Sequence, residues 1–530
     1  MKIALAQINP TVGAIEANTG KIIDYLNKAK EQGADLLVFP ELAITGYPPE
    51  DLVLKPQFIT DNIDALKEIV KASKGVGVYI GFVDRRGKDL FNAGAFINNG
   101  KIVETYCKNN LPNYGVFDEK RYFKEGTKAS VVSFKGMKIG LSICEDIWIE
   151  EGPYKGEARA GAKIILNINA SPYHVGKIFE RGALLRKRAI KTKAYVVYVN
   201  MVGGQDELVF DGGSMVFDPK GKLIASASQY KEELLVFDIE GGGSLAPWLH
   251  EMGEIYEAVK LGVKDYVDKN GFKEVIIGLS GGIDSALTAA IAVDTLGPSR
   301  VHALFMPSEY SAKQSFDDAA EAAKNIGVEL KVIPINEIYS VYLAKLEPYF
   351  EGKPADITEE NLQARVRGKI LMAFSNKFGW LVLTTGNKSE TSTGYCTLYG
   401  DMAGGFNVLK DIPKTLVYKL ANWRNKKREI IPRSIIDRAP TAELKPNQTD
   451  QDTLPPYDIL DKIIHAYVEE NKSFKEIVKM GIPEATVRKT ISMIDRSEYK
   501  RRQSPPGPRI TKRAFGKDWR LPITNAYKNF

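Results

Sequence analysis

Ile276-Ile-Gly-Leu-Ser-Gly-Gly-Ile-Asp-Ser285 is the stretch that decides the fold of the second half of this 530-residue chain. An apolar strand runs into a glycine-rich turn, and a helix begins directly after the turn. Backbone N–H groups in such a turn and the N-terminus of the following helix form a cradle for an anion, and phosphate is its natural guest. Because the stretch lacks both the Walker ending Gly-Lys-[Ser/Thr] and the Gly-x-Gly-x-x-Gly of dinucleotide folds, it indicates neither an ordinary NTPase nor a dehydrogenase.

Strands and helices alternate on both sides of this turn. Expected strands are Val275–Leu279, Val301–Met306, Leu330–Pro334 and Leu381–Thr384, and expected helices are Gly253–Lys269, Ser311–Asn325 and Glu359–Phe378. This rhythm predicts βαβ units and a doubly wound parallel sheet. We expect the segment 458–502 to be helical and the segment 504–530 to be irregular and basic.

The first half is richer in strands. We expect them at Ile3–Asn9, Asp35–Pro40, Val76–Phe82, Gly94–Asn98, Lys138–Cys144, Ala162–Asn169, Tyr195–Val202, Ser214–Asp218 and Glu233–Ile239. Helical patterns at Ala17–Gln32 and Phe179–Thr192 lie between some of them, which predicts a layered α/β domain. The run Gly241-Gly-Gly-Ser244 with Pro247 breaks the pattern and predicts a linker. We therefore expect two domains, residues 1–245 and residues 246–530, as the length also favours.

Composition and charge exclude several classes of protein. No apolar run reaches the roughly 18 residues of a bilayer span, and the start Met1–Asn9 alternates like a strand, unlike a signal peptide. We therefore expect a cytoplasmic protein with no membrane partner. The net charge of +7 is spread along the chain rather than gathered in a stripe, so no nucleic-acid partner is expected. Three widely spaced cysteines and four scattered histidines support neither a disulfide framework nor a zinc site.

Three local signatures in the first half each carry one reactive side chain. They are Phe39-Pro-Glu-Leu-Ala-Ile-Thr-Gly-Tyr47, Tyr106-Cys-Lys-Asn-Asn-Leu-Pro-Asn-Tyr114 and Ser142-Ile-Cys-Glu-Asp-Ile-Trp148. A cysteine nucleophile needs a base to form the thiolate, and the resulting oxyanion needs a positive donor. Cys144, Glu41 and Lys108 fit these three roles. Taken singly, such a cysteine is more often a small buried hydrophobe and such a lysine a solvated surface residue.

In order and flanking context, this set resembles the Glu-Lys-Cys triad of the nitrilase superfamily. The resemblance covers most of residues 1–240 and implies an αββα sandwich. In glutamine-using relatives, Tyr114, Ser171 and Lys177 match positions that hold the charged end of the amino acid. Glu119 matches a second acidic position that positions the lysine and completes the expected glutamine-binding set. Each of these has an alternative reading as an ordinary polar loop residue.

The glycine-rich turn carries a second resemblance. Ser280-Gly-Gly-Ile-Asp-Ser285 is similar to the pyrophosphate loop of the N-type ATP pyrophosphatases, which adenylate a substrate and release pyrophosphate. The resemblance implies that ATP contacts Ser280, Gly281, Gly282, Asp284 and Ser285. The alternative is a plain strand-to-helix turn in which Asp284 is a favourable charge near a helix N-terminus.

One chain that holds both domains resembles the glutamine-dependent NAD synthetases over nearly its whole length. Further motifs support this family over the synthetases of GMP or asparagine: Leu383-Thr-Thr-Gly-Asn-Lys-Ser-Glu390, Tyr399-Gly-Asp-Met-Ala-Gly-Gly-Phe406, Lys410-Asp-Ile-Pro-Lys414 and Leu454-Pro-Pro-Tyr-Asp458. The resemblance implies that glutamine supplies ammonia. It further implies that nicotinic acid adenine dinucleotide (deamido-NAD) is adenylated by ATP and that ammonia then displaces AMP to give NAD.

The same resemblance assigns residues in the second half. Asp284 and Glu390 would hold magnesium, and Thr385 would contact ATP. Asn361, Glu390 and Lys512 would contact deamido-NAD, and the basic run around Lys512 offers cations to a pyrophosphate, unless it is a solvated tail. The resemblance also implies a homo-oligomer and a tunnel for ammonia.

Two points leave alternatives open. The segment Asn447-Gln-Thr-Asp-Gln-Asp452 follows the family only loosely in its acidic positions, which leaves one edge of the synthetase site in doubt. The cluster Lys500-Arg-Arg502 would also suit a pyrophosphatase that acts on tRNA, for which steep salt dependence of binding is the test. A regulatory protein whose first half only binds is the other alternative, and the presence of all three triad residues argues against it.

Overall fold

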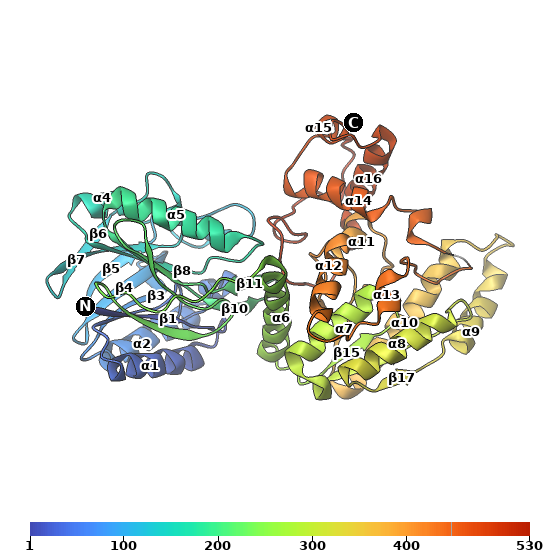
Figure 1. Cartoon of the computed structure of the whole chain (residues 1–530), viewed down its shortest axis with the longest axis horizontal. Helices are drawn as coiled ribbons and strands as arrows, with labels where there is room; N and C mark the ends of the chain where they lie inside the picture. Colours follow the sequence, from blue (N-terminus) through green and yellow to red (C-terminus); the bar gives the residue numbers. More distant parts are fainter. Residues whose placement is uncertain (447) are drawn as a thin grey trace. The chain divides into compact units, whose positions relative to one another are not determined.

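A computed structural model describes residues 1–446 and 448–530, and Figure 1 shows the whole chain. The described residues form two compact units, Met1–Glu251 and Met252–Phe530. Asn447, in the segment that follows the family only loosely, lies outside the described residues.

The first unit is built on two six-stranded sheets. The first has the order β14-β1-β2-β3-β4-β5 and the second the order β13-β12-β9-β8-β7-β6. The strands of the first sheet are β1 (Lys2–Gln7), β2 (Leu36–Val38), β3 (Gly77–Arg86), β4 (Asp89–Asn98), β5 (Lys101–Cys107) and β14 (Glu233–Asp238). Those of the second are β6 (Ser130–Phe134), β7 (Met137–Ile143), β8 (Ile164–Asn169), β9 (Tyr195–Asn200), β12 (Met215–Phe217) and β13 (Leu223–Ser226).

Alternation along the strands builds the layers. In β1, Ile3 and Leu5 enter the core between the two sheets, whereas Ala4 and Ala6 face the helices, as the period of two of a strand requires. Helices α1 (Ile15–Glu31) and α2 (Pro56–Ala72) cover the first sheet, and α4 (Tyr154–Arg159) and α5 (Lys177–Thr192) cover the second (Figure 1). The expected αββα sandwich is confirmed.

Several elements of this unit escaped the sequence patterns. Strands β6 and β13, the hairpin β10 (Val202–Gln205) and β11 (Leu208–Asp211), and helix α2 were not predicted as elements. The hairpin strands are four residues each, so they lack a long apolar run. The glycine run expected as a linker is hydrogen-bonded to β13 of the first unit. Gly243 N donates to Ile224 O at 2.9 Å, and Ser226 N donates to Ser244 O at 2.9 Å.

The second unit contains a five-stranded sheet of parallel strands in the order β17-β16-β15-β18-β19. The strands are β15 (Val275–Gly278), β16 (Val301–Phe305), β17 (Leu330–Val332), β18 (Leu381–Thr384) and β19 (Phe406–Asn407). The chain builds outward from β15 in one direction and then returns to its other side with β18, which confirms the doubly wound sheet. The carboxyl ends of β15 and β18 therefore flank the point where the winding reverses, the usual place for a ligand.

Helices pack around this sheet, and further helices follow them along the chain toward the C-terminus. Those around the sheet are α6 (Glu251–Lys269), α7 (Ile283–Leu296), α8 (Lys313–Ile326), α9 (Asn336–Leu346), α10 (Ile357–Phe378), α11 (Lys388–Thr393), α12 (Lys414–Asn425) and α13 (Arg433–Asp437). Those that follow are α14 (Tyr457–Ile464), α15 (Phe474–Val478), α16 (Glu484–Arg496) and α17 (Glu498–Arg501), with a π-helical turn at His465–Glu469. The expected helical tail is thus broken, because Ser473 caps one helix and Pro483 begins another.

Gly81 on β3 makes a close backbone approach that yields a prediction about stability. A Cβ at this position would lie 2.3 Å from Leu42 N and 2.7 Å from Glu41 Cα. Because backbone cannot give way as a side chain can, Gly81→Ala should destabilise the first unit by about 1–3 kcal/mol. Gly20 in α1 is the control, since nothing lies within 4 Å of its added Cβ. Gly20→Ala should be neutral or stabilising in calorimetry, and a melting temperature of Gly81→Ala at or above that of the parent protein would contradict the prediction.

Candidate active sites

Cys144 sits on a sharp turn at the end of β7. Its backbone has φ 44° and ψ −102°, a strained conformation for a residue with a side chain, and helix α3 (Glu145–Trp148) follows directly. Cys144 N donates to Ile168 O at 2.9 Å. Asp146 accepts from Ile143 N at 3.1 Å and from the Tyr106 hydroxyl at 2.6 Å, which ties the turn to β5. The fold thus holds the thiol on a rigid strand-to-helix turn.

Lys108 lies between two carboxylates in the interior of the first unit. Its Nζ is 2.7 Å from Glu41 Oε1 and 2.8 Å from Glu119 Oε1, and all three side chains are almost completely buried. Tyr47 donates its hydroxyl to Glu119 at 2.9 Å, and Asn92 Nδ2 donates to Glu41 Oε1 at 2.6 Å. Charges removed from water in this way are stable only when paired and hydrogen-bonded, and this cluster meets both conditions.

The electrostatics of the cluster keep the lysine charged and the thiol protonated. Burial raises the pKa of the Cys144 thiol, and the charge of Glu41 raises it further, although Lys108 pulls it down. Burial alone would lower the pKa of Lys108, but Glu119 and Glu41 together hold it well above its ordinary value. Burial also raises the pKa of Glu119 to about 7. Cys144 therefore needs a base to become a nucleophile.

Charged and aromatic groups gather around α3. The Tyr114 hydroxyl donates to the Glu145 carboxylate at 3.0 and 3.1 Å. Lys177, the first residue of α5, places its Nζ 3.9 Å from the centre of the Trp148 ring. Ser171 is buried and follows β8, where its N–H donates to Asn200 Oδ1 at 2.9 Å. Tyr114 and Lys177 thus gather at the helix that follows Cys144, whereas Ser171 is held beside the end of β9.

Asn92 and Glu145 are polar residues of this site that the sequence motifs did not predict. Asn92 lies in the middle of β4, where nothing in the local sequence marks it. Glu145 follows Cys144 directly, so its position next to a nucleophile was an available signal.

In the second unit, the turn after β15 is organised by its two serines. Ser280 Oγ lies 3.1 Å from Ser285 Oγ, and Ser285 Oγ donates to Gly282 O at 2.9 Å. Gly281 has φ +82°, and a Cβ there would lie 2.3 Å from Ser315 O. Only glycine fits this position, because both the backbone conformation and the neighbouring carbonyl exclude a side chain.

Two cavities of about 370 and 220 Å³ meet at this turn. Both are lined by Ser280 and Thr385. The larger one includes Asn361 of α10 and also Cys396. The smaller one includes the rest of the predicted phosphate loop and Glu390; its predicted members are Ser280, Gly281, Gly282, Asp284, Ser285, Thr385 and Glu390. All the residues predicted for ATP thus line the smaller cavity, and Ser280 and Thr385 also line the larger one.

Lys414 joins Asp284 and Glu390, two of the acidic residues that line the smaller cavity. Its Nζ bonds to Asp284 and lies 3.5 Å from Glu390 Oε1. Asn387 Nδ2 donates to Asp284 Oδ1 at 3.0 Å, while its Oδ1 accepts from Glu390 N at 3.0 Å. Burial raises the pKa of Glu390 to about 8 against the opposing effect of Lys414. Lys414 was not predicted as a site residue, although it ends one of the quoted motifs.

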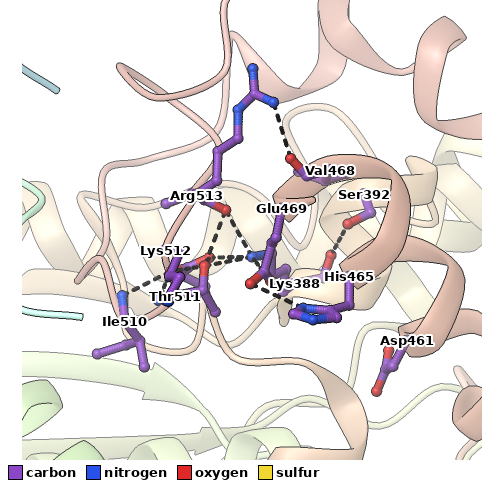
Figure 2. Close-up of polar contacts among 12 residues, drawn as sticks. Lys388, Ser392, Asp461, His465, Val468, Glu469, Ile510, Thr511, Lys512 and Arg513 are labelled. Carbon is purple, nitrogen blue, oxygen red and sulfur yellow. Dashed lines mark hydrogen bonds and ion pairs between the residues drawn. The ribbon is translucent and has the colours of Figure 1, made fainter. Parts of the chain in front are cut away.

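The structure also bears on metal binding and on the positions of Asp450 and Lys512. Within residues 1–446 and 448–530, no group of three or more His, Cys, Asp and Glu side chains is arranged to hold a metal ion. Asp450, in the loosely matching segment, lines the smaller cavity and accepts from the Tyr457 hydroxyl at 2.7 Å. Lys512 is exposed and lines neither cavity; it lies between Thr511 and Arg513 (Figure 2).

Comparison with known proteins assigns each half of the chain to a family. Residues 2–243 match the carbon-nitrogen hydrolase family, and residues 255–504 match NAD synthase. A glutamine-dependent NAD(+) synthetase from Thermotoga maritima is 46% identical over 100% of this chain and 99% of its own. The chain belongs to the glutamine-dependent NAD(+) synthetases. The synthetase from Aquifex aeolicus is 45% identical over 99% of this chain and 100% of its own.

Solved structures of this family agree. The glutamine-dependent NAD(+) synthetase from Acinetobacter baumannii, solved with adenosine diphosphate, is 45% identical, with a TM-score of 0.81 over 100% of this chain and 99% of its own. The Cytophaga hutchinsonii synthetase, at 24% identity and a TM-score of 0.89 over 99% of this chain and 98% of its own, shares the fold. This NAD(+) synthetase is thus an enzyme with a glutaminase domain of the carbon-nitrogen hydrolase family and an NAD synthase domain. None of the described helices is long and apolar enough to cross a membrane.

The electrostatics around Cys144 predict opposite effects of two substitutions on its thiol. Glu41→Gln should lower the pKa of Cys144, because a negative charge that raises it is removed while Lys108 stays. Lys108→Met should raise that pKa, because the cation that lowers it is lost. The thiolate should therefore form at lower pH in the first variant and at higher pH in the second.

The rate of alkylation by iodoacetamide, followed against pH, measures this difference. Cys144→Ala gives the background from Cys107 and Cys396, whose pKa values burial raises to about 11 and about 12. Shifts in the same direction for both variants would contradict the account.

Proposed function

We propose that Cys144, Glu41 and Lys108 carry out glutamine hydrolysis in the first unit. Glu41 takes the thiol proton, and Cys144 attacks the side-chain amide carbon of glutamine. Lys108 stabilises the oxyanion. The amide nitrogen takes this proton from Glu41 and leaves as ammonia, and water then hydrolyses the thioester to glutamate and the free thiol. The observation that carries this proposal is the buried Glu41–Lys108–Glu119 cluster, whose charges act on a thiol held at a strained turn.

The groups around α3 suit the charged end of glutamine. Glu145 with Tyr114 offers a negative site for the ammonium group, and Lys177 offers a positive site for the carboxylate. Ser171 would add a polar contact from the end of β8. Glu119 is fully engaged with Lys108 and Tyr47, so we assign it an indirect role in glutamine binding, through the position of the lysine.

We propose that ATP occupies the two joined cavities of the second unit. Its phosphates would lie in the smaller cavity against Ser280, Gly281, Gly282 and Ser285, with Thr385 at the junction. The adenosine diphosphate in the Acinetobacter baumannii relative supports a nucleotide site in this family. The carboxylate of deamido-NAD would attack the α-phosphate, pyrophosphate would leave, and ammonia would displace AMP from the adenylate to give NAD(+).

Asp284 and Glu390 are the residues that would hold magnesium. Two carboxylates face a single cation, the Lys414 ammonium, so this corner of the cavity already accommodates positive charge. Magnesium in proteins is usually held by one or two carboxylates together with substrate phosphates, which fits two acids rather than a complete protein cage. When bound, it would neutralise charge on the phosphates.

The remaining assignments rest on the family resemblance. Asn361 in the larger cavity, Glu390 and the exposed Lys512 would contact deamido-NAD. We keep the domain boundary between residues 245 and 246, close to where the compact units divide. Assembly as a homo-oligomer and a cytoplasmic location also stay predictions.

Separate sites for ammonia release and ammonia use predict that Cys144 can be removed without loss of synthesis. Cys144→Ala should lose glutamine-dependent NAD(+) formation by about ten-thousand-fold, yet keep synthesis from a high concentration of ammonium salt. Glu41→Ala and Lys108→Ala should behave alike, because the three residues serve one step. A folded Cys144→Ala protein that binds ATP but makes no NAD(+) from ammonium would refute the two-site scheme.

Asp284 provides the matching test of the synthetase site. Asp284→Asn should slow pyrophosphate release by about 100-fold or more, because the variant loses the full negative charge with which Asp284 would hold magnesium beside the phosphates. Glutamine hydrolysis should remain close to that of the parent protein. Asp437→Asn is the control, since this aspartate is exposed on α13 and forms an exposed salt bridge with Arg433. Pyrophosphate release by Asp284→Asn at the rate of this control would overturn the assignment.

A further inference from the structure

Lys388 is a completely buried lysine that no step above uses. It is the first residue of α11, and its side chain is 0% exposed. Its Nζ donates to Glu469 Oε1 at 2.7 Å, to Thr511 Oγ1 at 2.7 Å and to Arg513 O at 3.0 Å. Asp411 Oδ1 lies 2.9 Å away. Figure 2 shows α11, the helical turn of Glu469 and the C-terminal segment converging on this ammonium group.

Asp411 forms further hydrogen bonds to the C-terminal segment. Its Oδ2 accepts from Ile510 N at 2.8 Å and from Thr511 N at 2.7 Å, and the Thr511 hydroxyl also donates to it. Asp411 belongs to the loop that leads into Lys414. Asp411, which binds the C-terminal segment, is therefore three positions before Lys414, the first residue of α12, which binds Asp284 and Glu390.

Lys388 is placed next to the site but does not reach into it. Asn387, its neighbour, bonds to Asp284 and Glu390, whereas Lys388 lines neither of the two cavities. Lys388 N donates to Ile412 O at 2.9 Å, which holds α11 against the Asp411 loop. A side chain so placed cannot touch ATP in these cavities, so its effect must pass through the segments that it joins.

The residues joined by Lys388 flank Lys512. Lys388 bonds the side chain of Thr511 and the carbonyl of Arg513, so the backbone on both sides of Lys512 is fixed. Resting on the proposed contact of Lys512 with deamido-NAD, we propose that Lys388 is a positioning residue that holds Lys512 ready for this dinucleotide. Without it, binding would have to order the segment 510–513, and affinity would fall.

Steady-state kinetics of the full chain with ammonium as nitrogen donor test this proposal. Lys388→Met should raise the KM for deamido-NAD about tenfold, leave the KM for ATP within about twofold and change kcat little. Lys419→Met, at an exposed position on α12, is the control and should change neither KM. A purely structural role would instead lower kcat or raise both KM values together, and either result would overturn the proposal.

A second variant covers the case in which Lys388→Met fails to fold, since two buried acids lose their cation. Thr511→Val replaces with a methyl group a hydroxyl that bonds Lys388, Asp411 and the Arg513 carbonyl. It should raise the KM for deamido-NAD in the same direction by a smaller factor. An unchanged KM in Thr511→Val would overturn the proposal on its own.

A double-mutant cycle distinguishes this proposal from the assignment of Lys512. If Lys388 acts through Lys512, then Lys388→Met should add little to the KM of Lys512→Ala. Independent, multiplied effects would overturn the positioning role and leave Lys512 as a dinucleotide contact. No effect of Lys512→Ala alone would overturn the proposed contact itself, and the positioning role with it.

Discussion

A buried lysine shared by two carboxylates is the interaction on which both halves of this enzyme depend. Among the residues that the structure describes it occurs three times: Lys108 between Glu41 and Glu119, Lys388 between Asp411 and Glu469, and Lys414 between Asp284 and Glu390. Each lysine alone would be costly to remove from water, and so would each acid. The charges of a cluster are stable in the interior only when the lysine and both carboxylates are present together. The fold must therefore bring together segments far apart in the sequence before any of these charges is stable.

Neutral donors complete each set. One cation and two anions leave carboxylate oxygens with spare lone pairs, and amide or hydroxyl groups fill some of them: Asn92 and Tyr47 in the first cluster, Asn387 in the Lys414 cluster and Thr511 in the Lys388 cluster. These donors fix the carboxylates in direction without changing the net charge. The excess of negative charge has a different effect in each place. Beside Cys144 it disfavours the thiolate before substrate binds, whereas beside the phosphate loop it favours a metal ion.

Sequence reasoning predicted both folds, and it named side chains that the structure brings together, such as Glu41 with Lys108, because these residues lie in local motifs at strand ends. It missed partners that only tertiary structure supplies. Asn92 comes from the middle of a strand with no motif, and Lys414 reaches Asp284 across 130 positions of sequence. The glycine run Gly241–Ser244 was read as a linker because composition cannot reveal that its backbone pairs with β13. Short strands such as β10 and β11 were missed because four residues are too few to leave a pattern.

The shared wall of the two cavities has a consequence for inhibition. Ser280 and Thr385 line both spaces, so a ligand in one space and a ligand in the other can contact the same two residues. A single compound that joins a nucleoside to a non-transferable acidic group would fill both spaces at once. The second half of such a compound would bind at the high effective concentration set by a short tether rather than at its free concentration. The conformational freedom of the tether would then limit its affinity more than the number of polar contacts it makes.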